Sequence, residues 1–306
     1  MAPLLASELP LPLWRRGKVR EVYHVPGDRL LIVASDRVSA FDVVMREPVP
    51  DKGRVLTQLA AYWFGVLAPV ARSHFITADD DEIIDTLPDL AGLRQQFTGR
   101  GMLVHRTAPV GFECVVRGYL AGSAWAEYCQ SGTLAGESLP SGLRESERFV
   151  PPIFSPATKA EHGHDENVPY ERMERGLGAP LAERLRDISL ALYAAGRDHA
   201  APRGIIIADT KFEFGIDPGG APVLIDEIFT PDSSRFWPAD GYAAGKAQPS
   251  FDKQPLRDWL AVERAHGRWD GNAPPPALPD AVVAATSARY REAYRRITGS
   301  ALGAGS

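Results

Sequence analysis

Two carboxylates, Glu213 and Asp226, lie in what reads as the two strands of a β-hairpin. The apolar runs 204–214 and 223–228 have the length of strands, and they flank a turn sequence at 217–220. Mg²⁺ is typically held by one or two carboxylates together with substrate phosphates. If the two side chains share one face of the hairpin, the pair suits a magnesium site that also binds a phosphorylated ligand.

The pairing register decides whether the two carboxylates meet, because side chains alternate between the faces of a strand. With a four-residue turn, Ile216 would pair with Ala221, and Lys211 would oppose Asp226. Glu213 and Asp226 would then be diagonal neighbours, about 7–8 Å apart at the backbone. Lys211 beside them could neutralise a phosphate. The same spacing also fits a salt-bridged surface hairpin that binds no ligand.

Three other clusters combine cations with glycine or hydroxyl side chains, which suits the binding of anions. The segment 16–20, RGKVR, precedes an expected strand, and its glycine lets the backbone approach a phosphate. The segment 117–123 begins with arginine and ends with serine at an expected strand-to-helix junction. Ser233, Ser234 and Arg235 follow the hairpin. A basic turn and an ordinary capped helix are the competing interpretations of these clusters.

The elements that would position these residues follow an α+β order, with a strand-rich front, a mixed second half and a helical end. Apolar residues recur at helical spacing in some segments, and short apolar runs bounded by turn residues predict strands in others. Strands are expected at 18–25, 29–34, 102–105, 112–117, 204–214 and 223–228, and helices at 54–68, 121–130, 180–198, 252–265 and 280–297. The segment 131–178 is rich in glycine, proline, serine and charge.

The composition excludes several classes of protein. The 306 residues are 44% hydrophobic and carry a formal net charge of -5, whereas general nucleic-acid binders carry a strong basic excess. Two cysteines make no disulfide framework, which favours a reducing cytoplasm. No apolar run approaches the roughly 20 residues that span a bilayer, and prolines break up the N-terminus too much for a signal peptide. We therefore expect a cytoplasmic protein whose partners are small molecules, not nucleic acid or membrane.

Seven segments, taken in order, resemble the family of phosphoribosylaminoimidazole-succinocarboxamide synthases, also called SAICAR synthetases. They cover nearly the whole chain, and DTKFEFG followed by DEIFTPDSSR is their most specific pair. The segments are GKVREVY (17–23), SDRVSAFDVVM (35–45), ECVVRGYLAGS (113–123), FSPATKAEHGHDEN (154–167), IIIADTKFEFG (205–215), LIDEIFTPDSSRFW (224–237) and SFDKQPLRDWL (250–260).

The resemblance implies a two-lobed α+β fold. An ATP cleft would lie between a β-rich N-terminal lobe at 1–108 and a larger α/β lobe at 109–306, which carries the substrate and metal sites. The resemblance also implies a ligase that uses ATP and Mg²⁺ to join L-aspartate to CAIR, 5-amino-1-(5-phospho-D-ribosyl)imidazole-4-carboxylate. The products would be SAICAR, ADP and phosphate, in purine biosynthesis. The insert at 131–178 resembles the longer, yeast-like members, which implies a monomer and leaves a dimer open.

The resemblance implies a role for each matching position. The phosphates of ATP would meet residues of the glycine loop and of two strands: Gly17, Lys18, Val19, Arg20, Glu113 and Lys211. The metal ligands would be Glu213 and Asp226, in agreement with the hairpin expected above. The substrate would contact Asp36, Ser39, Asp42, Arg117, Ser123, Lys159, Asp165, Ser234, Arg235 and Lys253. Three cations would act in catalysis: Lys18, Lys211 and Arg235.

The implied chemistry explains this choice of residues. A carboxylate is a poor acyl donor. ATP could activate the CAIR carboxylate as an acyl phosphate, which the aspartate amine then attacks. The alternative order, in which the amine attacks before phosphorylation, stays open. Such transfer depends on positioning and charge neutralisation. Two alternative functions remain. A small-molecule kinase is disfavoured because the set Arg117, Ser123 and Arg235 indicates a second anionic nucleotide. A non-catalytic nucleotide-binding protein is disfavoured because it would need no paired carboxylates.

Overall fold

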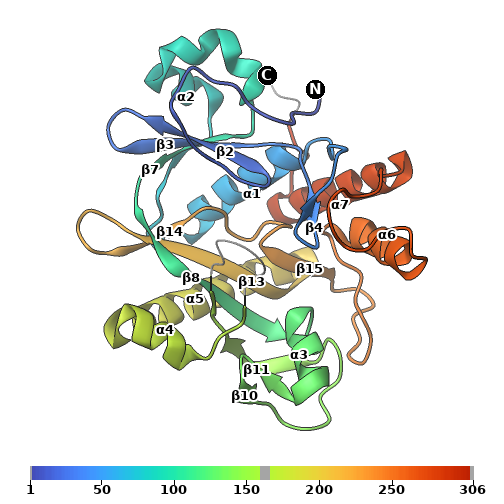
Figure 1. Cartoon of the computed structure of the whole chain (residues 1–306). Helices are drawn as coiled ribbons and strands as arrows, with labels where there is room; N and C mark the ends of the chain where they lie inside the picture. The colour runs from blue at the N-terminus through green and yellow to red at the C-terminus, as the bar shows by residue number, and fades with distance from the viewer. Residues whose placement is uncertain (1, 159–165, 304–306) are drawn as a thin grey trace.

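A five-stranded antiparallel sheet forms the upper part of the molecule in the computed structural model, which describes residues 2–158 and 166–303 (Figure 1). Its strand order is β1-β2-β3-β7-β6. The bounds are β1 Leu13–Arg16, β2 Arg20–Val25, β3 Arg29–Ala34, β6 Phe75–Thr77 and β7 Gly101–His105. Its central strands are buried on both faces, which explains why β3 reads as a continuous apolar run.

Alternation along β3 (Arg29–Ala34) divides the core around this sheet. Leu30 and Ile32 pack with the helix α1 (Lys52–Leu67) on one face. Leu31 and Val33 pack on the other face, against the helix α2 (Asp80–Thr86) and the 3-10 helix η1 (Pro88–Gln96). The sheet is thus a layer between helices.

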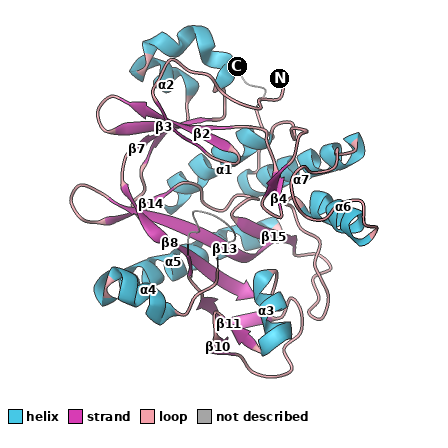
Figure 2. Ribbon diagram, in the orientation of Figure 1, coloured by secondary structure: helices cyan, strands magenta, loops and turns pink. Residues whose placement is uncertain are grey.

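A second sheet of six strands lies across the middle of the molecule, with the order β11-β8-β13-β14 and with β12 and β15 paired to β8 and β13 (Figure 2). The long strands β8 and β13 form its centre. The helix α5 buries Leu185 and Leu192 in the same cluster as Val116 and Phe212 of these strands. The bounds are β8 Ala108–Tyr119, β11 Arg148–Phe154, β12 Ala157–Thr158, β13 Ile205–Ile216, β14 Pro222–Ile225, β15 Ser234–Pro238 and α5 Ala179–Ala200.

Shorter elements and two C-terminal helices complete the fold. Helix α7 packs along α1 and α6, and its Tyr290, Ala293 and Ile297 enter the main core. The remaining bounds are β4 Ser39–Ala40, β5 Val43–Val44, α3 Ser123–Ser131, β9 Thr133–Leu134, β10 Glu137–Ser138, α4 Tyr170–Leu177, η2 Ala201–Arg203, α6 Gln254–Ala265 and α7 Asp280–Thr298. Within the described residues, no helix has the length and apolar character that a bilayer span requires.

The prediction of an α+β fold is confirmed, and most predicted elements form close to the expected bounds. Several short elements were not predicted: β1, β4, β5, β6, α2, η1, η2, β15, and the strands and the helix α4 inside the segment 131–178. The segment 72–74, which precedes β6 of the N-terminal sheet, is hydrogen-bonded to β14 of the second sheet. The backbone N–H of His74 donates to the carbonyl of Leu224 at 2.9 Å. We propose a division near residue 108, where β8 begins.

The predicted register of the β13–β14 hairpin is wrong by one residue. Ile216 pairs with Pro222, not with Ala221, and Glu213 faces Ile225. Asp217 causes the shift through two hydrogen bonds with Ala221. The Asp217 backbone N–H donates to the Ala221 carbonyl at 2.9 Å, and Asp217 Oδ1 accepts from the Ala221 N–H at 2.8 Å. These bonds hold a five-residue turn where four residues were expected.

The shift changes the neighbour of Lys211. This residue pairs with Val115 of β8 and does not oppose Asp226. Asp226 lies one residue beyond the end of β14, with a left-handed φ of 64°. Simple alternation along the hairpin therefore does not place its carboxylate.

Candidate active site

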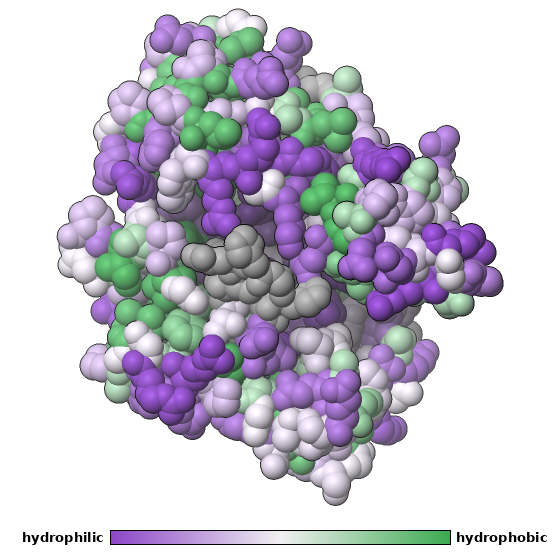
Figure 3. Space-filling view, viewed as in Figure 1, coloured by the Kyte–Doolittle hydropathy of each residue, from purple (hydrophilic) through white to green (hydrophobic). Residues whose placement is uncertain are grey.

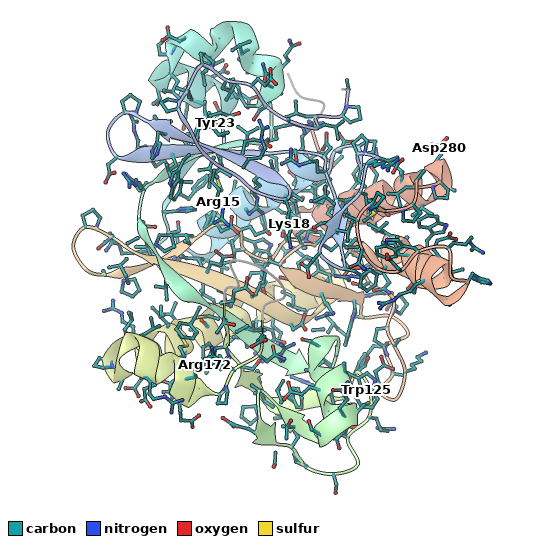
Figure 4. The ribbon with its side chains drawn as sticks, in the orientation of Figure 1. Arg15, Lys18, Tyr23, Trp125, Arg172 and Asp280 are labelled. Atoms are coloured by element: carbon teal, nitrogen blue, oxygen red, sulfur yellow. The ribbon has the colours of Figure 1, made fainter. Side chains whose placement is uncertain are left out.

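A cavity of about 390 Å³ lies between the N-terminal sheet and the β13–β14 hairpin. Val22, Leu30, Ile32 and Ile225 give it apolar walls. Its rim is polar, and Figure 4 shows Arg15 and Lys18 on the underside of the upper sheet, directed toward the middle of the molecule. An apolar slot beside cations suits a planar base that carries phosphates. We call this space the wider cavity.

The turn between β1 and β2 forms one edge of the wider cavity, and all four residues predicted there, Gly17, Lys18, Val19 and Arg20, line it. The Gly17 N–H donates to the Arg20 carbonyl at 2.8 Å, which closes the turn. Lys18 Nζ donates to Asp42 Oδ1 at 2.6 Å. Asp42, a predicted substrate contact, therefore lies at the wider cavity and not with the other predicted substrate residues.

Glu213 and Asp226 both line the wider cavity, although the register that predicted their meeting is wrong. Arg20 forms ion pairs with Asp226 and, at 2.6 Å, with Glu227. Burial alone would lower the pKa of Arg20, but these two carboxylates raise it well above its ordinary value. The guanidinium is thus a permanent cation between the acidic side chains.

The donor set fits a metal whose shell a ligand completes. In the described part of the chain, no three His, Cys, Asp or Glu side chains gather in a way that could hold a metal ion. Two carboxylates at a phosphate-sized cavity are what Mg²⁺ uses when a nucleotide supplies further oxygens. The guanidinium of Arg20 beside Asp226 indicates that this position favours a positive charge.

His74 lines the wider cavity beside Asp226, a contact that was not predicted. It is 5% exposed, and within the described residues its Nε2 has no hydrogen-bond partner. Burial lowers the pKa of His74 to about 4, so the imidazole is neutral at neutral pH. A single histidine before a short strand carries no local signal of this contact, because Asp226 is far away in the sequence.

Lys211 and Glu113 line both the wider cavity and a second, narrower one. Lys211 Nζ donates to Glu113 Oε1 at 2.6 Å. Burial would lower the pKa of Lys211, but Glu113 and Glu213 raise it above its ordinary value. An ammonium group is therefore fixed where the two spaces meet.

The narrower cavity, about 210 Å³, is lined by Arg117, Ser123, Ser234 and Arg235, all of which were predicted to bind substrate. Asp209 holds the two arginines: it accepts from Arg117 Nη1 at 3.4 Å and from Arg235 Nη1. Three adjacent strands, β8, β13 and β15, supply this set, because Asp209 pairs with both arginines in the sheet register. Two forked cations with nearby hydroxyls suit a phosphate or carboxylate.

Two further hydrogen bonds fix the orientation of the Arg117 side chain. Its Nε donates to Ser155 Oγ at 2.8 Å, and its Nη2 donates to Asn167 Oδ1 at 3.0 Å. Neither partner was among the predicted site residues. Asp209 could have been found, because it shares a strand face with Lys211 and Glu213. Figure 3 shows hydrophilic residues gathered just above the centre of the view, below the upper sheet.

A buried ionic cluster lies beneath the narrower cavity. Asp232 lines the cavity and accepts from Lys52 Nζ at 2.7 Å and from the Tyr290 hydroxyl at 2.5 Å, while Lys253 Nζ lies 3.6 Å away. Burial would raise the pKa of Asp232, but Lys253 and Lys52 hold it well below its usual range. Lys253 thus contacts a cavity residue without lining the cavity itself.

We expect Lys52→Met to destabilise the protein by about 3 kcal/mol, because it removes the buried partner of Asp232 and leaves this carboxylate with the Tyr290 hydroxyl and the longer contact to Lys253. The Lys52 side chain is fully buried, whereas that of Lys253 keeps 13% exposure. Urea unfolding followed by circular dichroism measures the effect. Lys253→Met is the matched control, with a smaller expected loss; equal losses would contradict the special role of the buried lysine.

Two predicted substrate contacts, Asp36 and Ser39, line neither cavity, and two others lie outside the described residues. Asp36 is fully buried outside both cavities, where it pairs with Arg100 at 2.9 Å and accepts from the Gly53 N–H at 3.0 Å. We assign it a structural role. Ser39 belongs to β4 and lines neither cavity. Lys159 and Asp165 lie outside the described residues.

The chain is similar to known proteins over nearly its whole length. The sequence model described as SAICAR synthetase matches residues 13–274. The phosphoribosylaminoimidazole-succinocarboxamide synthase of Methylibium petroleiphilum is 55% identical over 97% of this chain and 98% of its own length. The structure of SAICAR-synthase from Saccharomyces cerevisiae complexed with SAICAR is 42% identical, with a TM-score of 0.88 over 97% of this chain and 99% of that one.

A SAICAR synthetase solved in complex with ADP is more distant, at 25% identity and a TM-score of 0.66 over 94% of this chain and 98% of that one. The match thus extends over nearly the full length of both sequence and fold. The chain belongs to the SAICAR synthetase family and is a carbon–nitrogen ligase that condenses CAIR with L-aspartate in purine biosynthesis.

Proposed function

We propose that ATP binds in the wider cavity and CAIR in the narrower one, and that a phosphoryl group passes between them beside Lys211. The observation that carries this assignment is that Lys211 and Glu113 line both spaces. A group at their junction can reach ligands on either side. Related proteins have been solved in complex with SAICAR and with ADP, which supports the binding of both kinds of ligand by this family.

In this assignment, one part of the wider cavity contacts the base of the nucleotide and another contacts its phosphates. The base lies against Val22, Leu30 and Ile32, and the phosphates lie under the turn that carries Lys18 and Arg20. Glu213 and Asp226 would hold Mg²⁺, with phosphate oxygens completing its shell. When bound, the ion neutralises charge on the transferring phosphoryl group. Lys18 and Lys211 provide the nearby protein cations.

The narrower cavity would hold the phosphate and ring substituents of CAIR. Arg117 and Arg235 present N–H groups for an anion, and Asp209 keeps both guanidinium groups in place. Ser123 and Ser234 add hydroxyl donors at the same wall. We place the CAIR carboxylate toward Lys211, which would make this ammonium, with Arg235 and Lys18, part of the catalytic charge set.

We infer that the reaction passes through an acyl phosphate. An oxygen of the CAIR carboxylate attacks the γ-phosphorus of ATP, and ADP leaves. The aspartate amine then attacks the activated carbonyl carbon, the nitrogen gives up a proton, and phosphate departs with the electrons of the C–O bond. The chain's own contribution is to align these groups and to keep cations beside the moving negative charge.

A cytoplasmic monomer fits this role. Both cysteines are free thiols, Cys114 buried and Cys129 exposed, as expected in a reducing compartment. Light scattering on the purified protein would distinguish a monomer from a dimer.

The assignment is tested by measuring ADP release with Mg-ATP, CAIR and L-aspartate, and then with each one omitted. We expect ADP and SAICAR to form together only when all three are present. ADP formation that is equally fast without aspartate would indicate a kinase or an uncoupled ATPase and would overturn the aspartate assignment. Wild-type rates without CAIR would overturn the use of the narrower cavity.

A further inference from the structure

One ion pair crosses the wider cavity and joins the two sheets. Arg20 belongs to β2 of the N-terminal sheet, and Asp226 follows β14, 206 residues later. The guanidinium binds Asp226 with one nitrogen and Glu227 with another, at 2.6 Å for the latter. Its side chain is 16% exposed, so the pair is largely shielded from water.

We propose that Arg20 occupies the place of the metal in the free protein and must release Asp226 before a divalent cation can bind there. This inference rests on the proposed function, in which Asp226 is a metal ligand. Nucleotide phosphates offer the guanidinium new oxygens and offer the metal its missing ligands. Metal and nucleotide therefore bind together, and Arg20 moves from the carboxylate to the phosphates.

The charges around the cavity support this exchange. Three of the four lysines and arginines that line it have a carboxylate partner in the free protein: Lys18 with Asp42, Lys211 with Glu113, and Arg20 with Asp226. Of these partners, only Asp226 is also a proposed metal ligand. A cation that arrives alone must displace the guanidinium and leave it with Glu227. A cation that arrives with nucleotide leaves the guanidinium with phosphate oxygens, which favour a forked donor.

The thermodynamic consequence is reciprocal. If nucleotide removes the competition of Arg20, it raises the affinity for the metal, and the metal raises the affinity for nucleotide by the same factor. Deleting the guanidinium should then improve metal binding in the absence of nucleotide. A gain larger than the one from removing another cation of the cavity is diagnostic, because the loss of any nearby positive charge strengthens a cation site to some extent.

Mn²⁺ binding to the full chain without nucleotide, followed by electron paramagnetic resonance, tests the exchange. We expect Arg20→Met to bind Mn²⁺ about tenfold more tightly than the wild type, the size of an ordinary coupling between two competing cations. The gain should disappear when Asp226→Asn is added to Arg20→Met. Arg16→Met is the matched control, because Arg16 lies in the same hairpin, is half exposed and pairs with Glu21 at 3.5 Å. Lys18→Met controls for a general loss of positive charge at the cavity.

The outcomes distinguish a failure of the proposed Arg20 exchange from a failure of the assignment of Asp226 as a metal ligand. Unchanged or weaker Mn²⁺ binding by a folded Arg20→Met, or an equal gain in Lys18→Met, would overturn the exchange. If Arg20→Met does not fold, Arg20→Lys replaces it, with a smaller gain expected because a lysine lacks the fork. Mn²⁺ binding in the presence of ADP that is unchanged by Asp226→Asn alone would instead reject the metal assignment.

Discussion

Replacing Asp226 with asparagine is expected to lower kcat about a thousandfold while the protein stays folded. The side chain is 30% exposed at the wider cavity, so little packing is lost. The backbone at this position is left-handed, with a φ of 64°, and asparagine tolerates that conformation well. What changes is the charge: one of the two carboxylates proposed to hold Mg²⁺ becomes a neutral amide, which is a weaker ligand.

The measurement is steady-state SAICAR formation at saturating ATP, CAIR and aspartate, with the Mg²⁺ concentration varied. Asp217→Asn is a suitable control, because this aspartate belongs to the same hairpin, pairs with Arg72 at 3.0 Å and lines neither cavity. We expect the control to weaken the turn and to retain activity. Near-wild-type kcat in Asp226→Asn would exclude its carboxylate from the metal site.

The β13–β14 hairpin shows which features of the structure can be predicted from the sequence and which cannot. Composition and alternation identified its two strands and its two carboxylates, because strand length and turn residues are local properties. The register was wrong, because Asp217 uses its side chain to hold one more residue in the turn. Asp226 still reaches the cavity, since the chain leaves β14 in a left-handed conformation that no pattern of apolar residues encodes.

Other parts of the site depend on contacts between distant segments. Lys52 reads as an ordinary charged residue at the start of a helix, yet it is fully buried against Asp232, 180 residues away. His74 and Asn167 likewise gain their roles only from the tertiary arrangement. The reverse holds for Asp36. The family resemblance implied a substrate contact, whereas its carboxylate accepts from the Gly53 N–H and pairs with Arg100.

Lys211→Met is expected to lower kcat by about 10²–10³-fold, with a much smaller effect on the KM for ATP. The ammonium sits where the two cavities meet, and the proposed phosphoryl transfer crosses that point. Methionine has a similar length and no charge, so it removes the electrostatic contribution and keeps most of the volume. Because the cation acts on the transferring group more than on bound ATP, kcat should carry the loss.

The partner of this lysine requires a control of its own. Glu113 is 4% exposed, and it would be left as a buried anion without its cation in Lys211→Met, which destabilises the protein independently of catalysis. The double variant Lys211→Met with Glu113→Gln removes that charge. If folding stability recovers while SAICAR formation stays low, the ammonium itself serves the reaction. If SAICAR formation recovers with stability, Lys211 serves to neutralise Glu113, and the cation for phosphoryl transfer must come from elsewhere in the two cavities.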